Sequence, residues 1–164
     1  MDVDFLFQLI AANQGGGGGS RYWRILVTAS SGNDPFWGVR LSEMSFKGTP
    51  GGADLTSPAE AVARSSASLP AAGSTTSSDK AFDDNPGTYW IFPNGNDLGP
   101  RWLSWEFASA QVINELTWVN DTNALYHIQD MVVQSSPDGS TWTDEWSEAG
   151  LPATNGGTIT TTRP

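Results

Sequence analysis

One segment of this sequence carries more structural information than any other: Lys80-Ala81-Phe82-Asp83-Asp84-Asn85-Pro86-Gly87-Thr88-Tyr89-Trp90. Hard cations such as Ca²⁺ bind about six to eight oxygen atoms from carboxylates, hydroxyls and carbonyls. Asp83, Asn85 and Thr88 offer all three kinds of oxygen. Pro86-Gly87 allows the backbone to reverse so that carbonyls face inward. The segment therefore predicts a cation-binding loop, with a surface turn that holds no ion as the plainer alternative.

The same segment matches a known signature. Its pattern Ala81-Phe82-Asp83-Asp84-Asn85-x-x-Thr88-x-Trp90 resembles the A-F-D-G-N-x-x-T-x-W motif of the discoidin family, also called coagulation-factor C-type or galactose-binding-like domains. Later segments resemble further motifs of that family in the same order: Trp102-Leu103-Ser104-Trp105-Glu106-Phe107, Val112-Ile113-Asn114-Glu115-Leu116 and the stretch from Val133 to Trp142. The resemblance covers about residues 21–148 and departs from the motif at Asp84, where the family has Gly. It implies an antiparallel β-sandwich of the jelly-roll type.

Two earlier segments resemble the strand pair that usually ends a discoidin domain: Arg21-Tyr22-Trp23-Arg24-Ile25 and the stretch from Val39 to Phe46. In this chain the pair comes first. The domain therefore resembles a circularly permuted form, similar to modules in structural proteins of tailed bacteriophages.

The resemblance also implies a structural calcium site to which this strand pair contributes. The family pattern assigns carboxylate ligands to Glu43 and Asp83, and carbonyl or hydroxyl ligands to the neighbouring positions. The full set that it implies is Ser42, Glu43, Lys80, Asp83, Asn85 and Thr88. These residues reach about seven oxygens, and the two carboxylates nearly balance the charge of the ion. An ion there would tie the displaced strand to the loop, which implies a stabilising role and not a catalytic one.

The composition favours an all-β protein with one domain. The 164 residues include eight Trp, seven Phe and 18 Gly but only 16% charged residues, as expected for aromatic packing and many turns. The net charge of −10 argues against nucleic-acid binding, because phosphate backbones require clustered Lys and Arg. Cysteine is absent from the sequence, which excludes disulfides, thiol catalysis and cysteine zinc sites.

Residues 1–14 form a separate apolar segment, followed by a Gly-rich linker over residues 15–20. The apolar run is far shorter than the roughly 20 residues that cross a bilayer. Asp2 and Asp4 stand where a secretory signal would carry positive charge. We expect residues 1–14 to dock on another chain of an assembly, with a first strand or a disordered end as the alternative; an engineered linker is a further alternative. The sandwich itself is expected over residues 21–164.

Alternation predicts the first strand. Trp23, Ile25 and Val27 fall on one face of residues 21–29, and Tyr22, Arg24 and Thr28 fall on the other. A hairpin is predicted around Pro137-Asp138-Gly139, a short strand near residues 61–66 of a long surface connection, and either an outer strand or a disordered end after Gly150. The tryptophans that we expect in the core are Trp23, Trp90, Trp105 and Trp142.

No residue set in the sequence indicates catalysis. His127 is the only histidine, and no Gly-x-Ser-x-Gly elbow accompanies it. The spacing of the acidic residues selects no glycosidase pair. We therefore expect a protein that is not an enzyme.

Three loops favour binding instead. Aromatic rings stack on the apolar faces of sugars, while amide, guanidinium and imidazole groups form hydrogen bonds with sugar hydroxyls. The loops near residues 30–38, 91–101 and 120–127 carry such groups and are expected to be exposed. The candidate ligand-binding residues are Phe36, Trp37, Asn94, Asn96, Arg101, Tyr126 and His127.

These features lead to three candidate functions. The first is a virion-associated module, part of a homo- or hetero-oligomeric assembly, that recognises cell-surface carbohydrate and is anchored through residues 1–14. The second is a capsid or tail decoration or assembly protein whose loops contact other subunits only. The third is an extracellular accessory module of a secreted glycoside hydrolase. The lack of a recognisable signal peptide favours the virion, since phage particles assemble in the cytoplasm. Neither nucleic-acid binding nor membrane insertion is expected.

Overall fold

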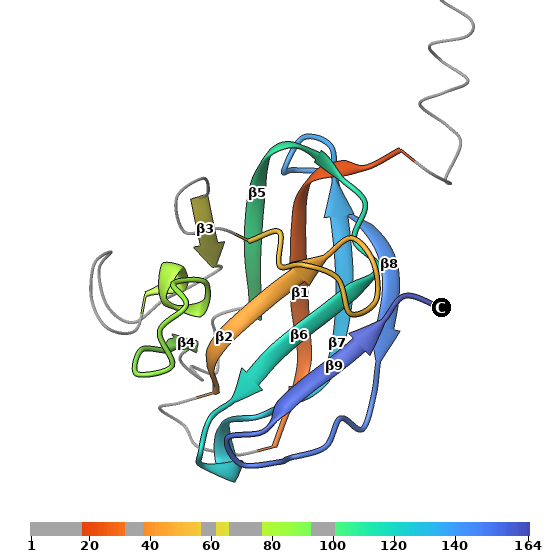
Figure 1. The fold of residues 1–164 in the computed structure, drawn as a ribbon. Helices are drawn as coiled ribbons and strands as arrows, with labels where there is room; N and C mark the ends of the chain where they lie inside the picture. The colour runs from red at the N-terminus through yellow and green to blue at the C-terminus, as the bar shows by residue number, and fades with distance from the viewer. Residues whose placement is uncertain (1–17, 32–37, 57–61, 66–76, 93–100) are drawn as a thin grey trace, which may run out of the picture.

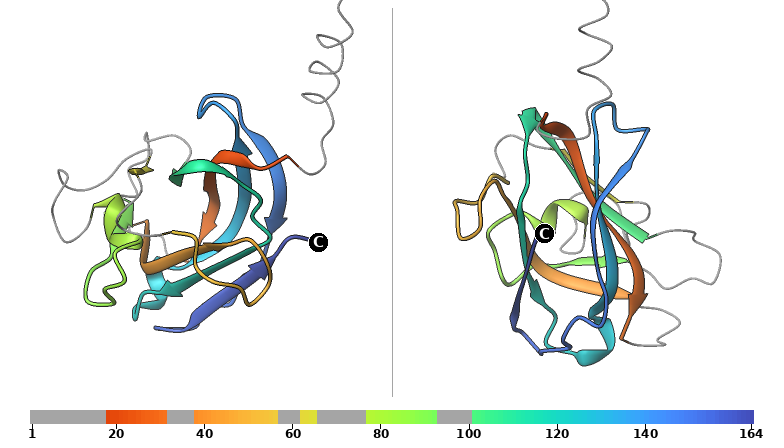
Figure 2. Two further views of the ribbon diagram at one scale, coloured as in Figure 1. Left: turned by 45° about the horizontal axis from the view of Figure 1, so that its top comes forward. Right: turned by 90° about the vertical axis from the view of Figure 1, so that its right-hand side faces the viewer.

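Two antiparallel sheets face each other in a computed structural model, which describes residues 18–31, 38–56, 62–65, 77–92 and 101–164 (Figures 1 and 2). The five-stranded sheet has the order β3 (Val62–Ser65), β5 (Arg101–Gln111), β1 (Ser20–Ser30), β7 (Ile128–Ser136) and β8 (Thr143–Glu148). The four-stranded sheet has the order β4 (Trp90–Phe92), β2 (Val39–Lys47), β6 (Glu115–Asn120) and β9 (Thr158–Thr162). Two short 3-10 helices complete the described elements: η1 (Ser78–Ala81) and η2 (Ala124–Tyr126). The predicted all-β sandwich is confirmed.

Alternating side chains build the core between the sheets. In β1, the side chains of Trp23, Ile25 and Val27 are buried while those between them are not, as the alternation predicts. In β5, Leu103, Trp105 and Phe107 are buried. The opposite sheet contributes further large apolar side chains to the same core: Leu41, Met44, Phe46, Trp90, Leu116 and Trp118.

The first two strands of the chain occupy central positions. β1 lies between β5 and β7, with Trp23 opposite both Trp105 and Ser135. β2 lies between β4 and β6 in the other sheet. Each of these strands is therefore hydrogen-bonded on both edges, so that neither sheet is continuous without the N-terminal strand pair.

The expectation for one tryptophan is wrong. Trp142 is only half-buried, because β8 begins at Thr143 and leaves Trp142 in the turn before it. Trp146 takes the core position instead, and its Nε1 donates to Thr161 Oγ1 at 3.0 Å. A register shift between Val133 and Gln134 separates the turn from the regular part of the β7–β8 pair. The other three tryptophans, Trp23, Trp90 and Trp105, are buried as predicted.

Several smaller predictions concern connections and ends. β3 lies within residues 61–66, where a short strand was expected, and β9 forms the outer strand of the tail. The predicted docking segment, residues 1–14, lies outside the described residues. Among the described residues, no helix has the length and apolar character needed to cross a membrane.

Candidate functional site

The turn after η1 is anchored in the core by its first residues. Ala81 and Phe82 are buried, and the Phe82 ring lies 4.5 Å from the ring centroid of Trp105 and 6.3 Å from that of Phe46. Phe82 N–H donates to Asp79 O at 3.1 Å, which closes the helical turn. The apolar pair of the signature thus fixes the point from which the oxygen-rich residues project.

Asp83 organises the turn that follows. Thr88 Oγ1 donates to Asp83 Oδ1 at 2.8 Å, and Lys80 Nζ lies 3.0 Å from Asp83 Oδ2. Burial opposes ionisation of this carboxyl, but the hydrogen bonds from Lys80 and Thr88 outweigh it and hold the pKa of Asp83 below its ordinary value. Thr88 N–H also donates to Asn85 O at 3.0 Å, and Thr88 Oγ1 lies 2.9 Å from the same oxygen. Asp83 is therefore a fixed carboxylate.

Asp84 occupies the place at which the discoidin motif carries Gly. Its φ is 55°, in the left-handed region that glycine enters freely and that other residues enter at a cost. Asp and Asn tolerate this region better than most side chains. The substitution therefore leaves the backbone conformation of a glycine position in place.

Glu43 reaches the turn from β2. The pairing of β2 with β6 shifts register between Leu41 and Glu43, so that Ser42 is an extra residue in β2. Glu43 Oε1 accepts from Asn85 N–H at 2.7 Å, forty-two positions along the chain. Burial raises the pKa of Glu43 to about 7. The negative charges of Asp83 and Asp84 add to this rise, while hydrogen bonds from backbone N–H groups of Asn85 and Asp84 reduce it.

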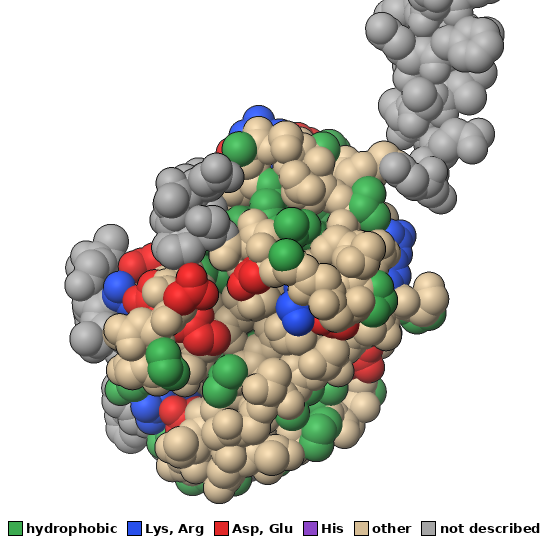
Figure 3. All heavy atoms as spheres, viewed as in Figure 1, with side chains coloured by type: hydrophobic (Ala, Val, Ile, Leu, Met, Phe, Trp, Pro, Cys, Tyr) green, Lys and Arg blue, Asp and Glu red, His purple; other side chains and the backbone are tan. Residues whose placement is uncertain are grey.

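Most of the predicted cation ligands come together in this arrangement. Hydrogen bonds link Glu43, Asp83, Asn85 and Thr88 directly, and Ser42 adjoins them at the bulge. Acidic side chains gather over this part of the surface, at the left of Figure 3. Burial raises the pKa of Glu43 most, and the charges of Asp83 and Asp84 add to it; a bound cation would offset both effects, so the residues fit a Ca²⁺ ion. No group of three or more His, Cys, Asp or Glu side chains suited to a metal occurs among the described residues, and carbonyl and hydroxyl oxygens would complete the shell.

Lys80 was predicted to contribute only its carbonyl. Its side chain adds something that the sequence did not indicate, because the ammonium group pairs with both Asp83 and Asp79, at 3.0 and 3.5 Å. The hydrogen bond to Asp83 raises the pKa of Lys80. Lys80 therefore places a positive charge beside the Asp83 carboxylate.

The described residues that flank the three predicted ligand loops meet at one end of the sandwich. Ser31 N–H donates to His127 O at 2.9 Å, and His127 N–H donates to Ser31 Oγ at 3.0 Å. Gly38 N–H donates to Phe92 O at 2.9 Å, and Arg101 Nη1 donates to Ser30 Oγ at 3.3 Å. Four of the candidates themselves lie outside the described residues: Phe36, Trp37, Asn94 and Asn96.

Two further candidate ligand-binding residues, Tyr126 and His127, are buried, although they were predicted to lie in an exposed loop. His127 is fully buried, and its Nε2 lies 2.7 Å from Asp121 O. Tyr126 is buried beside Arg40, whose guanidinium lies 5.2 Å from the Tyr126 ring and forms an ion pair with Asp121. The expectation that residues 120–127 form an exposed loop is therefore wrong at these positions, because tertiary contacts with β2 and Ser31 cover them. A role in ligand contact stays a prediction for both.

The short strand β4 connects the two regions. Thr88 of the acidic turn stands two residues before Trp90, and Phe92 at the other end of β4 lies in the loop-bearing end of the sandwich. β4 pairs with β2 from Leu41–Trp90 to Val39–Phe92. An ion that fixes the turn would therefore also fix the start of the following loop.

The sequence analysis missed a group of polar and aromatic residues on the outside of the five-stranded sheet. Its members are Tyr22, Arg24, Trp102, Ser104, Glu106 and Trp142. Alternation had placed Tyr22 and Arg24 on the outward face of β1, and the same rule places Trp102 and Glu106 on the outward face of β5. What the sequence could not supply is the pairing of these two strands.

Comparison with known proteins gives one match. A family model described as F5/8 type C domain matches residues 61–163. No curated protein and no solved structure matches the chain significantly. The matched range begins beside β3 and leaves out β1 and β2, the central strands of the two sheets.

Proposed function

This chain belongs to the F5/8 type C domain family, also called the discoidin family, and on that premise we propose that it is a non-catalytic, virion-associated module that binds cell-surface carbohydrate. Domains of this family are commonly carbohydrate- or protein-binding modules and are typically not catalytic. The sugar-binding surface is the end of the sandwich that carries the loops near residues 30–38 and 91–101. Its residues include Trp37 and Arg101.

One observation carries this proposal. Three segments far apart in the sequence were each predicted to contact ligand, and the residues that flank them are joined by hydrogen bonds between Ser31 and His127 and between Gly38 and Phe92. A binding surface needs such convergence, because several groups must reach one ligand at once. Arg101 lies among these flanks and presents a planar set of donors that suits sugar hydroxyls.

Ca²⁺ has a structural part in the proposal. The ligands would be the carboxylates of Glu43 and Asp83, the Thr88 hydroxyl and nearby carbonyls, including those of Ser42, Lys80 and Asn85. The ion supplies positive charge where these acidic side chains crowd, and so holds β2 against the turn. Because the turn leads directly into β4, the ion also stabilises the base of the carbohydrate-binding loops.

The virion association rests on the order of the strands. β1 and β2 precede the matched family range and complete both sheets, which supports a permuted domain of the kind that the sequence resembles in tailed-bacteriophage proteins. In a permuted domain of this kind β1 is the first strand of the sandwich, and residues 1–14, which precede it in the sequence, would serve as an anchoring arm for other virion subunits.

A glycan array tests the carbohydrate function. The wild-type protein is expected to bind a subset of neutral glycans, and Trp37→Ala and Arg101→Gln are expected to lose that binding. Val112→Ala is the matched control, because Val112 is an exposed apolar side chain between β5 and β6, outside the three loops. Absence of binding to every glycan, or binding that ignores both loop substitutions, would exclude the loop end as a carbohydrate site.

A deletion tests the anchoring. Removal of residues 1–14 is expected to abolish incorporation into particles while the sandwich stays folded, which circular dichroism checks. If the shortened protein still enters particles at the wild-type level, residues 1–14 are not the anchor and the assembly contacts lie on the sandwich.

A further inference from the structure

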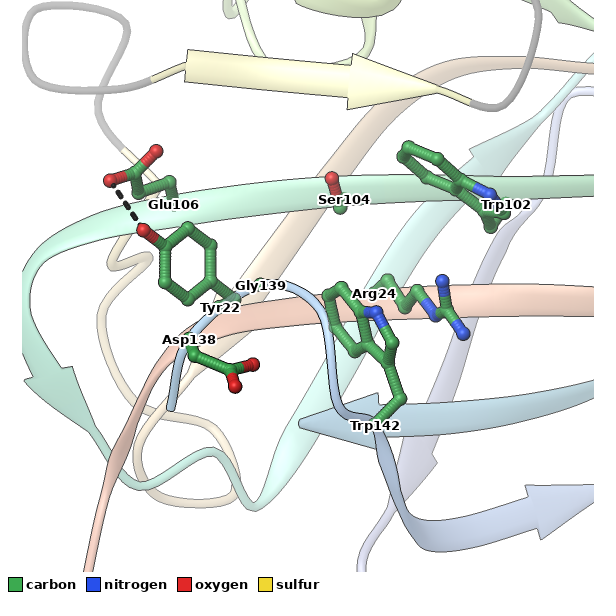
Figure 4. Close-up of a pocket in the computed structure, with 8 residues that line it drawn as sticks. All are labelled: Tyr22, Arg24, Trp102, Ser104, Glu106, Asp138, Gly139 and Trp142. Carbon is green, nitrogen blue, oxygen red and sulfur yellow. Dashed lines mark hydrogen bonds between the residues drawn. The ribbon is translucent and has the colours of Figure 1, made fainter. Parts of the chain in front are cut away.

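A hollow of about 190 Å³ lies on the outer face of the five-stranded sheet (Figure 4). Tyr22 and Arg24 line it from β1, on the face opposite the buried Trp23. Alternate residues of β5 and the turn between β7 and β8 form the rest of the lining: Trp102, Ser104, Glu106, Asp138, Gly139 and Trp142. Three separate parts of the chain thus build one depression.

Arg24 is held between two aromatic rings in this hollow. Its guanidinium carbon lies 3.9 Å from the Trp142 ring centroid and 5.7 Å from that of Trp102. Arg24 Nε donates to Gln134 Oε1 at 2.6 Å, which fixes the plane of the group. Among the described residues, neither terminal nitrogen of Arg24 has an acceptor. Arg24 therefore presents oriented donors beside two partly exposed indole rings.

The other end of the hollow is polar and equally fixed. Tyr22 Oη donates to Glu106 Oε1 at 3.1 Å, as the dashed line in Figure 4 shows. Arg21, just outside the hollow, forms an ion pair with the same Glu106 oxygen at 2.8 Å. The turn holds Asp138 through its Oδ1, which accepts from the N–H groups of Ser140 and Thr141 at 2.8 Å. The polar groups need no large rearrangement to receive a ligand.

This combination of groups has a specific chemical meaning. Indole faces favour flat apolar surfaces, while guanidinium, phenol, hydroxyl and carboxylate groups favour a partner that both donates and accepts hydrogen bonds. A pyranose ring has both properties. The volume is below the roughly 300–1,000 Å³ of pockets for drug-sized ligands, which limits the ligand to about one ring. The lining carries two carboxylates and one guanidinium, a balance that disfavours anionic ligands.

We propose that this hollow is a second carbohydrate-binding site, which takes one neutral pyranose ring beside Arg24 and the two indole rings of Trp102 and Trp142. Arg24 donates to its hydroxyls, and Glu106 and Asp138 accept from them. The proposal rests on the proposed carbohydrate-binding function but not on the loop end, since it uses a different face of the sandwich. With two sites, the module would bind branched or repeated glycans more tightly than a single sugar, because the second contact is intramolecular.

Nuclear magnetic resonance of the full chain tests the proposal. Each of the eight Trp residues gives an indole N–H signal, and single substitutions assign the signals of Trp102, Trp142 and Trp37. The probes are the methyl β-glycosides of galactose, glucose and N-acetylglucosamine. At least one of these sugars is expected to move the Trp102 and Trp142 signals saturably, with a dissociation constant in the millimolar range.

Substitutions then test whether the sugar binds in the hollow or elsewhere on the surface. Trp142→Ala is expected to weaken the binding about tenfold, the effect of losing one stacked ring, and Trp142→Phe to restore much of it. Val112→Ala, the exposed apolar control, is expected to leave it unchanged. A thermal melt of each variant confirms that the fold is intact, and the wild-type signals alone decide the question if a variant does not fold.

The outcomes distinguish this site from the loop end. Movement of the Trp102 and Trp142 signals with an unmoved Trp37 signal supports the hollow and contradicts the loop site. The reverse pattern overturns this inference and leaves the proposed function standing. Tighter binding of methyl sialoside or methyl glucuronide than of the neutral sugars overturns the neutral-ligand assignment. If no sugar moves the two indole signals, the hollow is not a carbohydrate site.

Discussion

Glu43 and Asp83 share one hydrogen-bond donor: the backbone N–H of Asn85 lies 2.7 Å from Glu43 Oε1 and 3.3 Å from Asp83 Oδ1. Two carboxylates from separate parts of the chain thus converge on one peptide group. Burial first, and then the nearby charge of Asp83, raise the pKa of Glu43, so that ionising both carboxyl groups costs free energy. The same proximity makes the two carboxylates a suitable binding site for a divalent ion.

We predict that Ca²⁺ stabilises the fold through this pair. At a hundredfold excess over the dissociation constant, a single site adds about 2.7 kcal/mol to the free energy of unfolding. Thermal melts with Ca²⁺ and with a chelator measure the effect, which Asp83→Asn is expected to abolish. Asp144→Asn is the control, since it alters a carboxylate on β8 and keeps an acceptor for Gln134. Equal melting temperatures of the wild type in both conditions would refute the site.

The metal-free protein should also show a specific pH dependence. The Glu43 pKa is raised from 4.5 to about 7, so the protonated carboxyl is favoured in the folded state. Its contribution to stability is therefore complete below pH 4.5 and is lost as the pH rises towards 7. Urea unfolding in chelator, compared between wild type and Glu43→Gln, isolates this contribution from those of other carboxyls. If the difference in unfolding free energy between wild type and Glu43→Gln stays constant from pH 4.5 to 7, the raised pKa of Glu43 is contradicted.

Asp84 provides a test of backbone conformation. Its φ of 55° is costly for alanine, by about 1–2 kcal/mol, but not for glycine. We expect Asp84→Gly to be more stable than Asp84→Ala by about 1 kcal/mol in urea unfolding. Both variants remove the same charge next to Glu43, so the comparison cancels the electrostatic change. Equal stabilities would show that the left-handed conformation is not maintained in solution.

The boundaries of the family match make a prediction about folding. A fragment of residues 61–163 lacks β1 and β2, which supply Trp23, Ile25, Leu41 and Phe46 to the core. We expect the fragment to give the poorly dispersed amide spectrum of an unfolded chain. A protein that begins at Gly18 keeps all nine strands of the described residues and is expected to fold. A dispersed spectrum from the fragment would mean that the first two strands are additions to a complete domain.

The sequence predicted those parts of the molecule in which nearby residues carry the information. The acidic turn could be recognised because Asp83, Asn85 and Thr88 are close together in the chain and bond to one another. Glu43 entered only through the family resemblance, since nothing local connects it with Asn85. The strand faces of β1 followed from alternation alone.

Other features depend on contacts between distant segments. Trp142 was expected in the core as a large aromatic of the hairpin, but the turn extends through Trp142 and β8 begins only at Thr143. His127 is buried because Ser31 covers it, which no local pattern indicates. The hollow on the outer face requires β1, β5 and the β7–β8 turn together. No local pattern in any of these segments indicates which of the others it contacts.

The central place of β1 also affects how the protein reaches its native state. Trp23 can pair only with Trp105 and Ser135, which leave the ribosome long after it does. Pairings over such chain separations form slowly, because loop closure costs entropy before any contact is gained. During synthesis the apolar side of this strand stays unpaired, a state that favours aggregation or capture by chaperones. We therefore expect the yield of folded protein to depend on translation speed and on the supply of chaperones.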